Sequence, residues 1–202
     1  MPDAPTRRHI VSVSSSSKKS GKSTVAAYLV RELAPVSALK VSSGSHAPSP
    51  IVTDVDIISR KGTDTGSLMR AGAEKVVWVN APPGMLAETI TEAIGLFPAD
   101  ATIIVEGNSA LEHLDVSFSV FVMTVPFEEF KPSADKALAR ADLVLVDMRW
   151  KLAGSNESSI ETTLSQRAPG ARAFFFADED GLDAALRETA DLALRNLRRS
   201  SQ

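Results

Sequence analysis

The chain has 202 residues, which is enough for one α/β domain with a large hydrophobic core. Its net charge of −3 argues against a general nucleic-acid-binding protein, and its lack of cysteine excludes disulfides, thiolate chemistry and cysteine-ligated zinc. No apolar run approaches the roughly 18 residues of a membrane span, and the start of the chain lacks the apolar region of a secretory signal, so we expect a cytoplasmic protein that does not contact membranes.

The first elements in chain order are a tail, a strand, a loop and a helix. Residues 1–8 are predicted to form a flexible tail, and residues 9–202 a single nucleotide-binding domain. The apolar run at residues 9–13 predicts a strand, and the helical spacing of residues 22–34 predicts a helix. The loop between them is rich in serine and lysine and ends in Gly-Lys-Ser-Thr. A strand, a loop of small residues, Gly-Lys-Ser and a helix in this order are the context that a phosphate-binding P-loop requires.

This loop would bind the phosphates of a nucleotide through its backbone, the helix N-terminus and a lysine. Its N–H groups point inward, the helix N-terminus adds partial positive charge, and Lys22 adds a full one. Ser23 carries the hydroxyl that would ligate Mg²⁺ beside the β- and γ-phosphates. Ser16 replaces the first glycine of the pattern G-x-x-x-x-G-K-[ST]. We therefore expect either a slightly reshaped loop or additional phosphate contacts from Lys18 and Lys19. The predicted nucleotide-binding residues are Ser17, Lys18, Lys19, Ser20, Gly21, Lys22, Ser23 and Thr24.

The rest of the chain alternates between strand and helix patterns. Further strands are predicted at residues 36–41, 75–80, 101–105, 115–124, 142–147 and 171–176, and further helices at 67–73, 85–96, 132–141, 158–166 and 182–197. Residues 42–53 are rich in proline and small polar residues and predict a long loop at the ligand edge of the sheet. About seven strands alternating with helices predict an α/β fold with a doubly wound, mostly parallel sheet of the P-loop NTPase type. The first two strands are expected to form a parallel pair.

Glu106 is the second chemically informative position. It follows an apolar strand directly, which is where a P-loop enzyme needs an acid to hold Mg²⁺ or to polarise water. Gly107 would let the backbone approach a phosphate closely. Asp54 and Asp56 have the alternating spacing of an edge strand. They would serve either as functional groups or only as surface charge.

Three short segments follow the P-loop along the chain, namely Leu39-Lys40-Val41, then Asp64 with Arg70-Ala71-Gly72-Ala73, and then Val105-Glu106-Gly107. Together with the P-loop they resemble the adaptor protein of molybdopterin-guanine dinucleotide biosynthesis. In that family the P-loop is followed by a strand ending in Lys-His, by a segment with Lys-Asp-Ser, Arg and Ala-Gly-Ala, and later by Val-Glu-Gly. This chain departs from the family in having Lys40-Val41 instead of Lys-His, and Asn108 where the family continues with an aromatic residue and a lysine.

The resemblance implies a protein that binds GTP with Mg²⁺, hydrolyses it slowly and is usually a dimer. Its partner would be an enzyme of molybdenum-cofactor biosynthesis, in the attachment of a nucleotide to the cofactor. The resemblance further implies that Asp64 approaches the Mg²⁺–phosphate site and that Lys40 lies at the crevice. With Asp64 added from the resemblance, the predicted catalytic set is Lys22, Glu106 and Asp64, and the predicted metal ligands are Ser23, Asp64 and Glu106.

Several alternatives stay open at the level of sequence. The choice between GTP and ATP stays open. Residues 141–146 resemble the strand before the guanine-reading motif of P-loop proteins, but Trp150 occupies the position of its aspartate. The base contact would then come from Asp147 or from stacking on Trp150. A second reading is an ATP-dependent small-molecule kinase or ligase resembling dethiobiotin synthetase, with Lys40, Arg70 and Asn108 as substrate contacts. A third is a P-loop fold that has lost its nucleotide.

Overall fold

The structure is a computed structural model that describes residues 8–45, 47–125, 130–149 and 157–200. The predicted tail therefore lies outside the described residues except for its last member. Arg8 donates hydrogen bonds to the carbonyls of Phe97 and Pro98, at 2.9 and 3.0 Å, so it is anchored rather than frayed.

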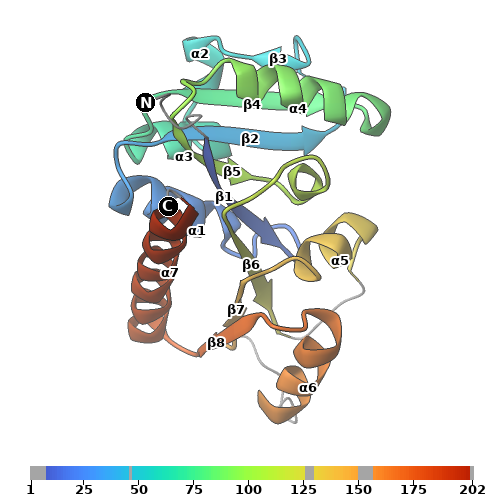
Figure 1. The fold of residues 1–202 in the computed structure, drawn as a ribbon, viewed down its shortest axis with the longest axis vertical. Helices are drawn as coiled ribbons and strands as arrows, with labels where there is room; N and C mark the ends of the chain where they lie inside the picture. The colour runs from blue at the N-terminus through green and yellow to red at the C-terminus, as the bar shows by residue number, and fades with distance from the viewer. Residues whose placement is uncertain (1–7, 46, 126–129, 150–156, 201–202) are drawn as a thin grey trace, which may run out of the picture.

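An eight-stranded sheet forms the centre of the molecule, in the strand order β3-β4-β2-β5-β1-β6-β7-β8 (Figure 1). The strands are β1 (His9–Ser15), β2 (Ser37–Ser43), β3 (Ile51–Val52), β4 (Val76–Ala81), β5 (Thr102–Glu106), β6 (Phe118–Thr124), β7 (Leu143–Asp147) and β8 (Arg172–Phe176). All neighbours are parallel except β3 and β4. The predicted α/β fold with a mostly parallel sheet is confirmed.

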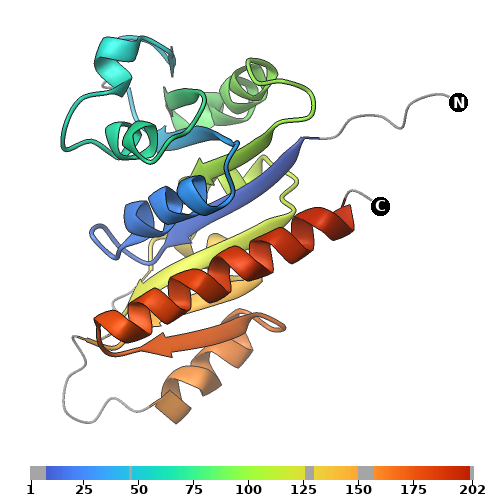
Figure 2. The same cartoon turned by 90° about the vertical axis from the view of Figure 1, so that its left-hand side faces the viewer.

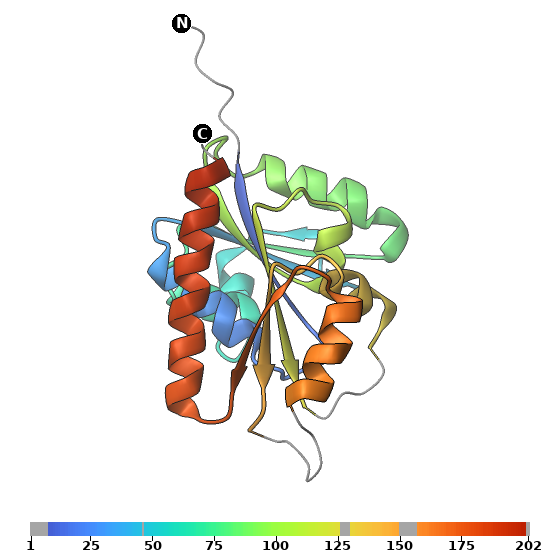
Figure 3. The same ribbon diagram turned by 60° about the horizontal axis from the view of Figure 1, so that its bottom comes forward.

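Helices cover both faces of the sheet. They are α1 (Lys22–Glu32), α2 (Val55–Ile58), α3 (Asp64–Arg70), α4 (Leu86–Gly95), α5 (Pro132–Leu138), α6 (Glu157–Arg167) and α7 (Glu179–Ser200), with the 3₁₀ turns η1 (Pro83–Met85) and η2 (Asn108–Glu112). Helices α1, α3 and α7 pack on one face, and α4, α5 and α6 on the other (Figures 2 and 3). No helix within the described ranges is both long and apolar enough to cross a lipid bilayer.

Alternation along the strands explains the two-sided core. In β1, Val11 and Val13 face α1 and α7, whereas Ile10 faces the opposite layer with α4. Both faces of a parallel strand are buried, so the strands read as continuous apolar runs. This pattern is why the sequence located seven of the eight strands.

Two predictions about the sheet are wrong. The segment predicted as a loop at residues 42–53 contains β3, a two-residue antiparallel edge strand on β4 that is too short to show any periodicity. β1 and β2 are parallel but are not neighbours, because β5 lies between them and pairs with both. A crossover helix fixes the handedness of a connection but not how many strand positions it skips.

Short helices near the ligand edge also begin elsewhere than predicted. α3 starts at Asp64, three residues before the prediction, because the Thr63 hydroxyl caps it by accepting a hydrogen bond from the N–H of Gly66 at 3.0 Å. Asp54 lies on no strand edge. It caps α2 by accepting hydrogen bonds from the N–H groups of Asp56 and Ile57. Local side-chain capping, not periodicity, decides both boundaries.

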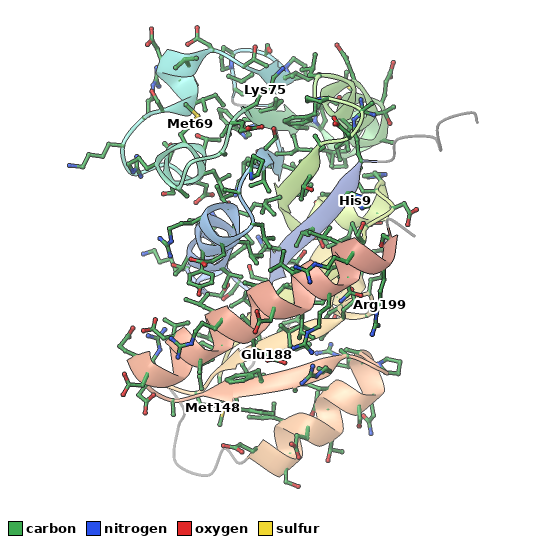
Figure 4. All side chains as sticks on the ribbon, turned by 60° about the vertical axis from the view of Figure 1, so that its left-hand side comes forward. His9, Met69, Lys75, Met148, Glu188 and Arg199 are labelled. Atoms are coloured by element: carbon green, nitrogen blue, oxygen red, sulfur yellow. The ribbon has the colours of Figure 1, made fainter. Side chains whose placement is uncertain are left out.

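The parallel strands place all their carboxyl ends at one edge. Figure 4 labels His9, at the start of β1, and Met148, directly after β7, at opposite edges of the sheet. The P-loop leaves β1 at the Met148 edge, as do the segments that follow β2, β5 and β7. Ligands of doubly wound sheets bind at this edge.

Candidate functional site

The P-loop connects β1 to α1 with two residues in the left-handed region. Gly21 has φ 89° and immediately precedes α1, and Lys19 has φ 65°. Ser16, which replaces the first glycine of the motif, does not have a positive φ. Its N–H extends the sheet by donating to the carbonyl of Val122 at 3.0 Å. The expected reshaping at Ser16 is therefore not needed, because the backbone there is one that any residue adopts.

Asn108 fixes the point where the chain leaves β1 and enters the loop. Its side-chain oxygen accepts a hydrogen bond from the N–H of Ser15 at 2.9 Å, and its side-chain amide donates to the Ser15 carbonyl at 2.8 Å. Within the loop, the hydroxyls of Ser15 and Ser20 both donate to the carbonyl of Ser17. Asn108 thus contacts the loop backbone with both of its polar groups, and its role as a substrate contact stays a prediction.

Five charged or hydroxyl side chains converge at the N-terminus of α1. The Ser23 hydroxyl lies 2.7 Å from Asp64 Oδ1 and 3.2 Å from Glu106 Oε1. Lys40 Nζ donates to Asp64 Oδ2 at 2.5 Å and to Glu106 Oε1 at 2.8 Å. Lys22 Nζ is 3.7 Å from Glu106 Oε1. All members of the predicted catalytic and metal sets are brought together here, with Lys40.

The strand register explains this convergence. Lys40 and Glu106 are direct partners across the β2–β5 pair, and Glu106 is the partner of Val13 across β1–β5. Because Val13 faces α1, both charged side chains point to the side of the sheet where α1 begins. Asp64 reaches the same point from another element, as the first residue of α3.

Opposite charges control the ionisation of this cluster. Burial alone would raise the pKa of Asp64, but its hydrogen bond and charge interaction with Lys40 outweigh burial and hold that pKa below the ordinary value. Burial alone would lower the pKa of Lys40, but Glu106 and Asp64 raise it. For Lys22, burial and the neighbouring charge of Lys40 together lower the pKa. Asp64 and Lys40 are therefore both charged at neutral pH.

The oxygen atoms present suit a magnesium ion. Glu106 is fully buried, and its second oxygen, Oε2, has no hydrogen-bond partner among the described residues. A hydroxyl and two carboxylates are hard oxygen ligands, and Mg²⁺ usually combines one or two carboxylates with phosphate oxygens and water. No cluster of three or more histidine, cysteine or acidic residues that could hold a metal occurs in the described ranges. The site fits Mg²⁺ that arrives with phosphates better than a metal held by protein ligands alone.

A cavity of about 900 Å³ opens beside this cluster. Its lining begins at the P-loop and continues past Lys40 to Ile57, Arg60 and Trp78. Neither Arg60 nor Trp78 is among the site residues predicted from the sequence. Trp78 reaches the cavity because it is the partner of Lys40 across β2 and β4, a pairing that is visible only once the sheet order is known. Arg70 does not line the cavity; it is exposed and donates to the Ser67 hydroxyl at 3.2 Å.

The end of β7 holds a second ion pair. Asp147 is almost fully buried and accepts hydrogen bonds from Arg149 Nε at 3.0 Å and Nη2 at 2.8 Å. Arg149 also contacts Glu179 and lies 5.4 Å from the centre of the Phe176 ring. The hydrogen bond and charge of Asp147 raise the pKa of Arg149. The predicted base contact Asp147 is therefore already occupied by an arginine, and the other predicted base contact, Trp150, lies outside the described residues.

No protein-family model matches this sequence, and no curated protein matches it. Solved structures do match. HypB from Helicobacter pylori, solved in complex with nickel, is 15% identical and superposes with a TM-score of 0.61, over 98% of this chain and 90% of that one. The hydrogenase maturation factor HypB from Archaeoglobus fulgidus is 13% identical, with a TM-score of 0.54 over 96% of this chain and 91% of that one.

Identities this low carry the fold and nothing finer. Both relatives cover nearly the whole chain, from β1 and the P-loop to α7. Together with the loop geometry and the strand order, they show that the chain has the nucleotide-binding fold of the P-loop NTPases.

Proposed function

We propose that this protein binds a purine nucleotide with Mg²⁺, with GTP preferred, and hydrolyses it slowly. The observation that carries the proposal is the convergence of Lys22, Ser23, Asp64 and Glu106 at the N-terminus of α1. A phosphate-binding helix N-terminus, a lysine and hard oxygen ligands in one place are the parts that phosphoryl transfer needs.

Each residue of the cluster has a separate role in this proposal. Lys22 and the backbone of the loop bind the phosphates, and Ser23, Asp64 and Glu106 hold the metal. A bound Mg²⁺ would supply positive charge that neutralises negative charge developing on the phosphates. Glu106 is also placed to orient a water molecule, because its Oε2 is free of protein partners in the described ranges. Lys40 has to release Asp64 Oδ2 before that oxygen is available as a ligand.

The preference for GTP and the output of the cycle rest on the resemblance in sequence. The segments around Asp64 and Glu106 resemble those of the molybdopterin-guanine dinucleotide adaptor family. We therefore propose that the protein assists guanylylation of the molybdenum cofactor as an adaptor, with a cofactor-biosynthesis enzyme as its partner and a homodimer as its working form.

Calorimetric titration with GTP and with ATP, each with Mg²⁺, tests the proposal. Lys22→Ala should weaken nucleotide binding by about 10- to 100-fold, the effect of losing a charge-assisted hydrogen bond. The variant should still fold, because the substitution removes only the 3.7 Å ion pair between Lys22 and Glu106. Glu106 keeps its closer ion pair with Lys40, at 2.8 Å. Lys136→Ala, on α5, is the matched control and should bind like the wild type, since that exposed lysine pairs with Glu112.

Three outcomes would count against the proposal at different levels. A Lys22→Ala variant that binds nucleotide like the wild type would overturn the P-loop assignment. Tighter binding of ATP than of GTP would leave nucleotide binding intact and overturn the guanine preference. Binding that is unchanged when EDTA removes Mg²⁺ would overturn the metal roles of Ser23, Asp64 and Glu106.

A further inference from the structure

The cavity extends well beyond the phosphate-binding cluster. One row of residues crosses three strands, because Glu106 on β5 pairs with Lys40 on β2, and Lys40 pairs with Trp78 on β4. Neighbours in register lie side by side on one face of a sheet, here the face that carries α1 and α3. Trp78 therefore stands beside Lys40, on the side away from Glu106 and the P-loop.

Trp78 forms a fixed, partly exposed wall of the cavity. Its indole N–H donates to the Ser42 hydroxyl at 2.9 Å, and that hydroxyl lies 3.2 Å from the carbonyl of Val79. The polar edge of the ring is thereby bound, while the ring lines the cavity together with Ile57. A held aromatic ring next to an aliphatic side chain is a surface for a flat, apolar group.

The residues that line the cavity carry an excess of positive charge. Five cations line it, namely Lys18, Lys19, Lys22, Lys40 and Arg60, against the single acid Asp64. Lys22 and Lys40 are used by the cluster at α1. The side chain of Arg60 is exposed and forms no ion pair or hydrogen bond with the part of the chain that the structure describes. A guanidinium in this position suits a carboxylate or phosphate of a ligand.

We propose that Ile57, Arg60 and Trp78 form a second binding site, for a small anion with a flat ring, next to the nucleotide. The ring lies against Trp78, the anionic group pairs with Arg60, and the opposite end of the molecule faces Lys40. This inference rests on the proposed function only for the position of the phosphates, which would lie on the other side of Lys40. With this second site, the protein would bind a second molecule next to its nucleotide.

The indole N–H resonance of Trp78 in a ¹H–¹⁵N spectrum tests this site. Trp150→Phe removes the only other tryptophan, and saturation with Mg²⁺ and a non-hydrolysable GTP analogue fills the P-loop. Phenyl phosphate is the probe, with benzyl alcohol supplying the ring without the charge and inorganic phosphate supplying the charge without the ring. We expect a saturable shift with phenyl phosphate and a response at least about 10-fold weaker with either comparator.

Substitution of Arg60 decides whether the charge matters. Arg60→Gln should weaken binding of phenyl phosphate by about 10-fold or more, whereas Arg70→Gln, on the exposed side of α3, should leave it unchanged. Both residues are exposed, so both variants are expected to fold, which the rest of the same spectrum verifies.

Several results would overturn the proposed site at Trp78 and Arg60. Absence of a saturable shift, equal responses to phenyl phosphate and inorganic phosphate, or equal effects of the two arginine substitutions would each do so. A shift that disappears when the analogue is bound would assign the probe to the P-loop instead. If calorimetry finds no nucleotide binding, the same titration on the nucleotide-free protein still reads the Trp78 site, so failure of one proposal does not imply failure of the other.

Discussion

At the scale of single residues, Asn108 holds the backbone at the start of the P-loop. It follows Glu106, a proposed metal ligand, by two positions and forms hydrogen bonds with both backbone groups of Ser15, 93 residues earlier in the chain. An asparagine is suited to this because it carries one acceptor and one donor on the same amide. The start of the P-loop is thus tied to the end of the strand that supplies the acid.

Replacing Asn108 should weaken nucleotide binding indirectly. Asn108→Ala removes two hydrogen bonds worth about 0.5–1.5 kcal/mol each, so we expect a loss of about 1–3 kcal/mol in the free energy of unfolding and a several-fold lower affinity for GTP. Asn108→Asp should be worse, because a carboxylate oxygen would face the Ser15 carbonyl. Calorimetry and urea unfolding measure the two effects. Asn196→Ala, which removes one hydrogen bond inside α7, is the control and should affect stability only.

Asp64 should make stability depend on pH at the acid end. Its pKa is lowered in the folded protein, so its contribution to stability is present above its unfolded-state pKa of about 3.9 and is lost as the pH falls through the lower folded value. Wild type should therefore lose more stability than Asp64→Asn between about pH 4 and 2, as read from urea midpoints at each pH. Asp183→Asn, an exposed acid of α7, controls for the loss of a negative charge. Parallel pH profiles for wild type and Asp64→Asn would contradict the role of Lys40 as its partner.

At the scale of elements, the site depends on how closely β5 approaches β2. Gly107 continues the β5–β1 ladder by donating to the carbonyl of Val13 at 3.1 Å, and its φ is 147°. A Cβ added there would lie 2.3 Å from the carbonyl oxygen of Val41, next to Lys40. Only glycine allows the two strands to bring Lys40 and Glu106 together at this point.

Gly107→Ala should therefore be strongly destabilising. Overlap with backbone and the unfavourable φ together predict a loss of about 3 kcal/mol in the free energy of unfolding, measured in urea. Gly95→Ala gives the contrast: nothing lies within 4 Å of a Cβ at that position near the end of α4, so stability should rise by about 0.5–1 kcal/mol. Equal effects of the two substitutions would show that the close approach is not what requires the glycine.

At the scale of the whole molecule, the candidate site is assembled from β1, β2, β5, α1 and α3, so a ligand bound there holds together elements from across the first half of the chain. Binding to the folded state alone shifts the unfolding equilibrium by mass action. Thermal stability is therefore a measure of occupancy.

We expect GTP with Mg²⁺, at about 100 times its dissociation constant, to raise the free energy of unfolding by about 2.7 kcal/mol and the melting temperature by several degrees. EDTA should remove most of this increase, and Lys22→Ala, with binding that is about 10- to 100-fold weaker, should show only about 0.4–1.4 kcal/mol at the same concentration. Scanning calorimetry checks both. An increase of the same size in Lys22→Ala would place the nucleotide elsewhere.

The sequence by itself determined the parts whose signals are local. The strand, loop and helix around Lys22 follow from composition and spacing, because a P-loop is one continuous segment. Buried parallel strands give apolar runs, so most of the sheet and the position of Glu106 at a strand end were also predictable.

The tertiary structure decided what depends on segments far apart in the chain. The order of the strands places Trp78 beside Lys40, and the cap at Thr63 moves the start of α3 to Asp64. Asn108 forms hydrogen bonds with the backbone of Ser15, and Arg60 lines the cavity. Neither contact could be predicted from the residues next to it in the sequence. The packing of the whole sheet decides which strands are neighbours, and this order decides which side chains are in contact. The hydrophobic periodicity of one strand therefore does not predict these contacts.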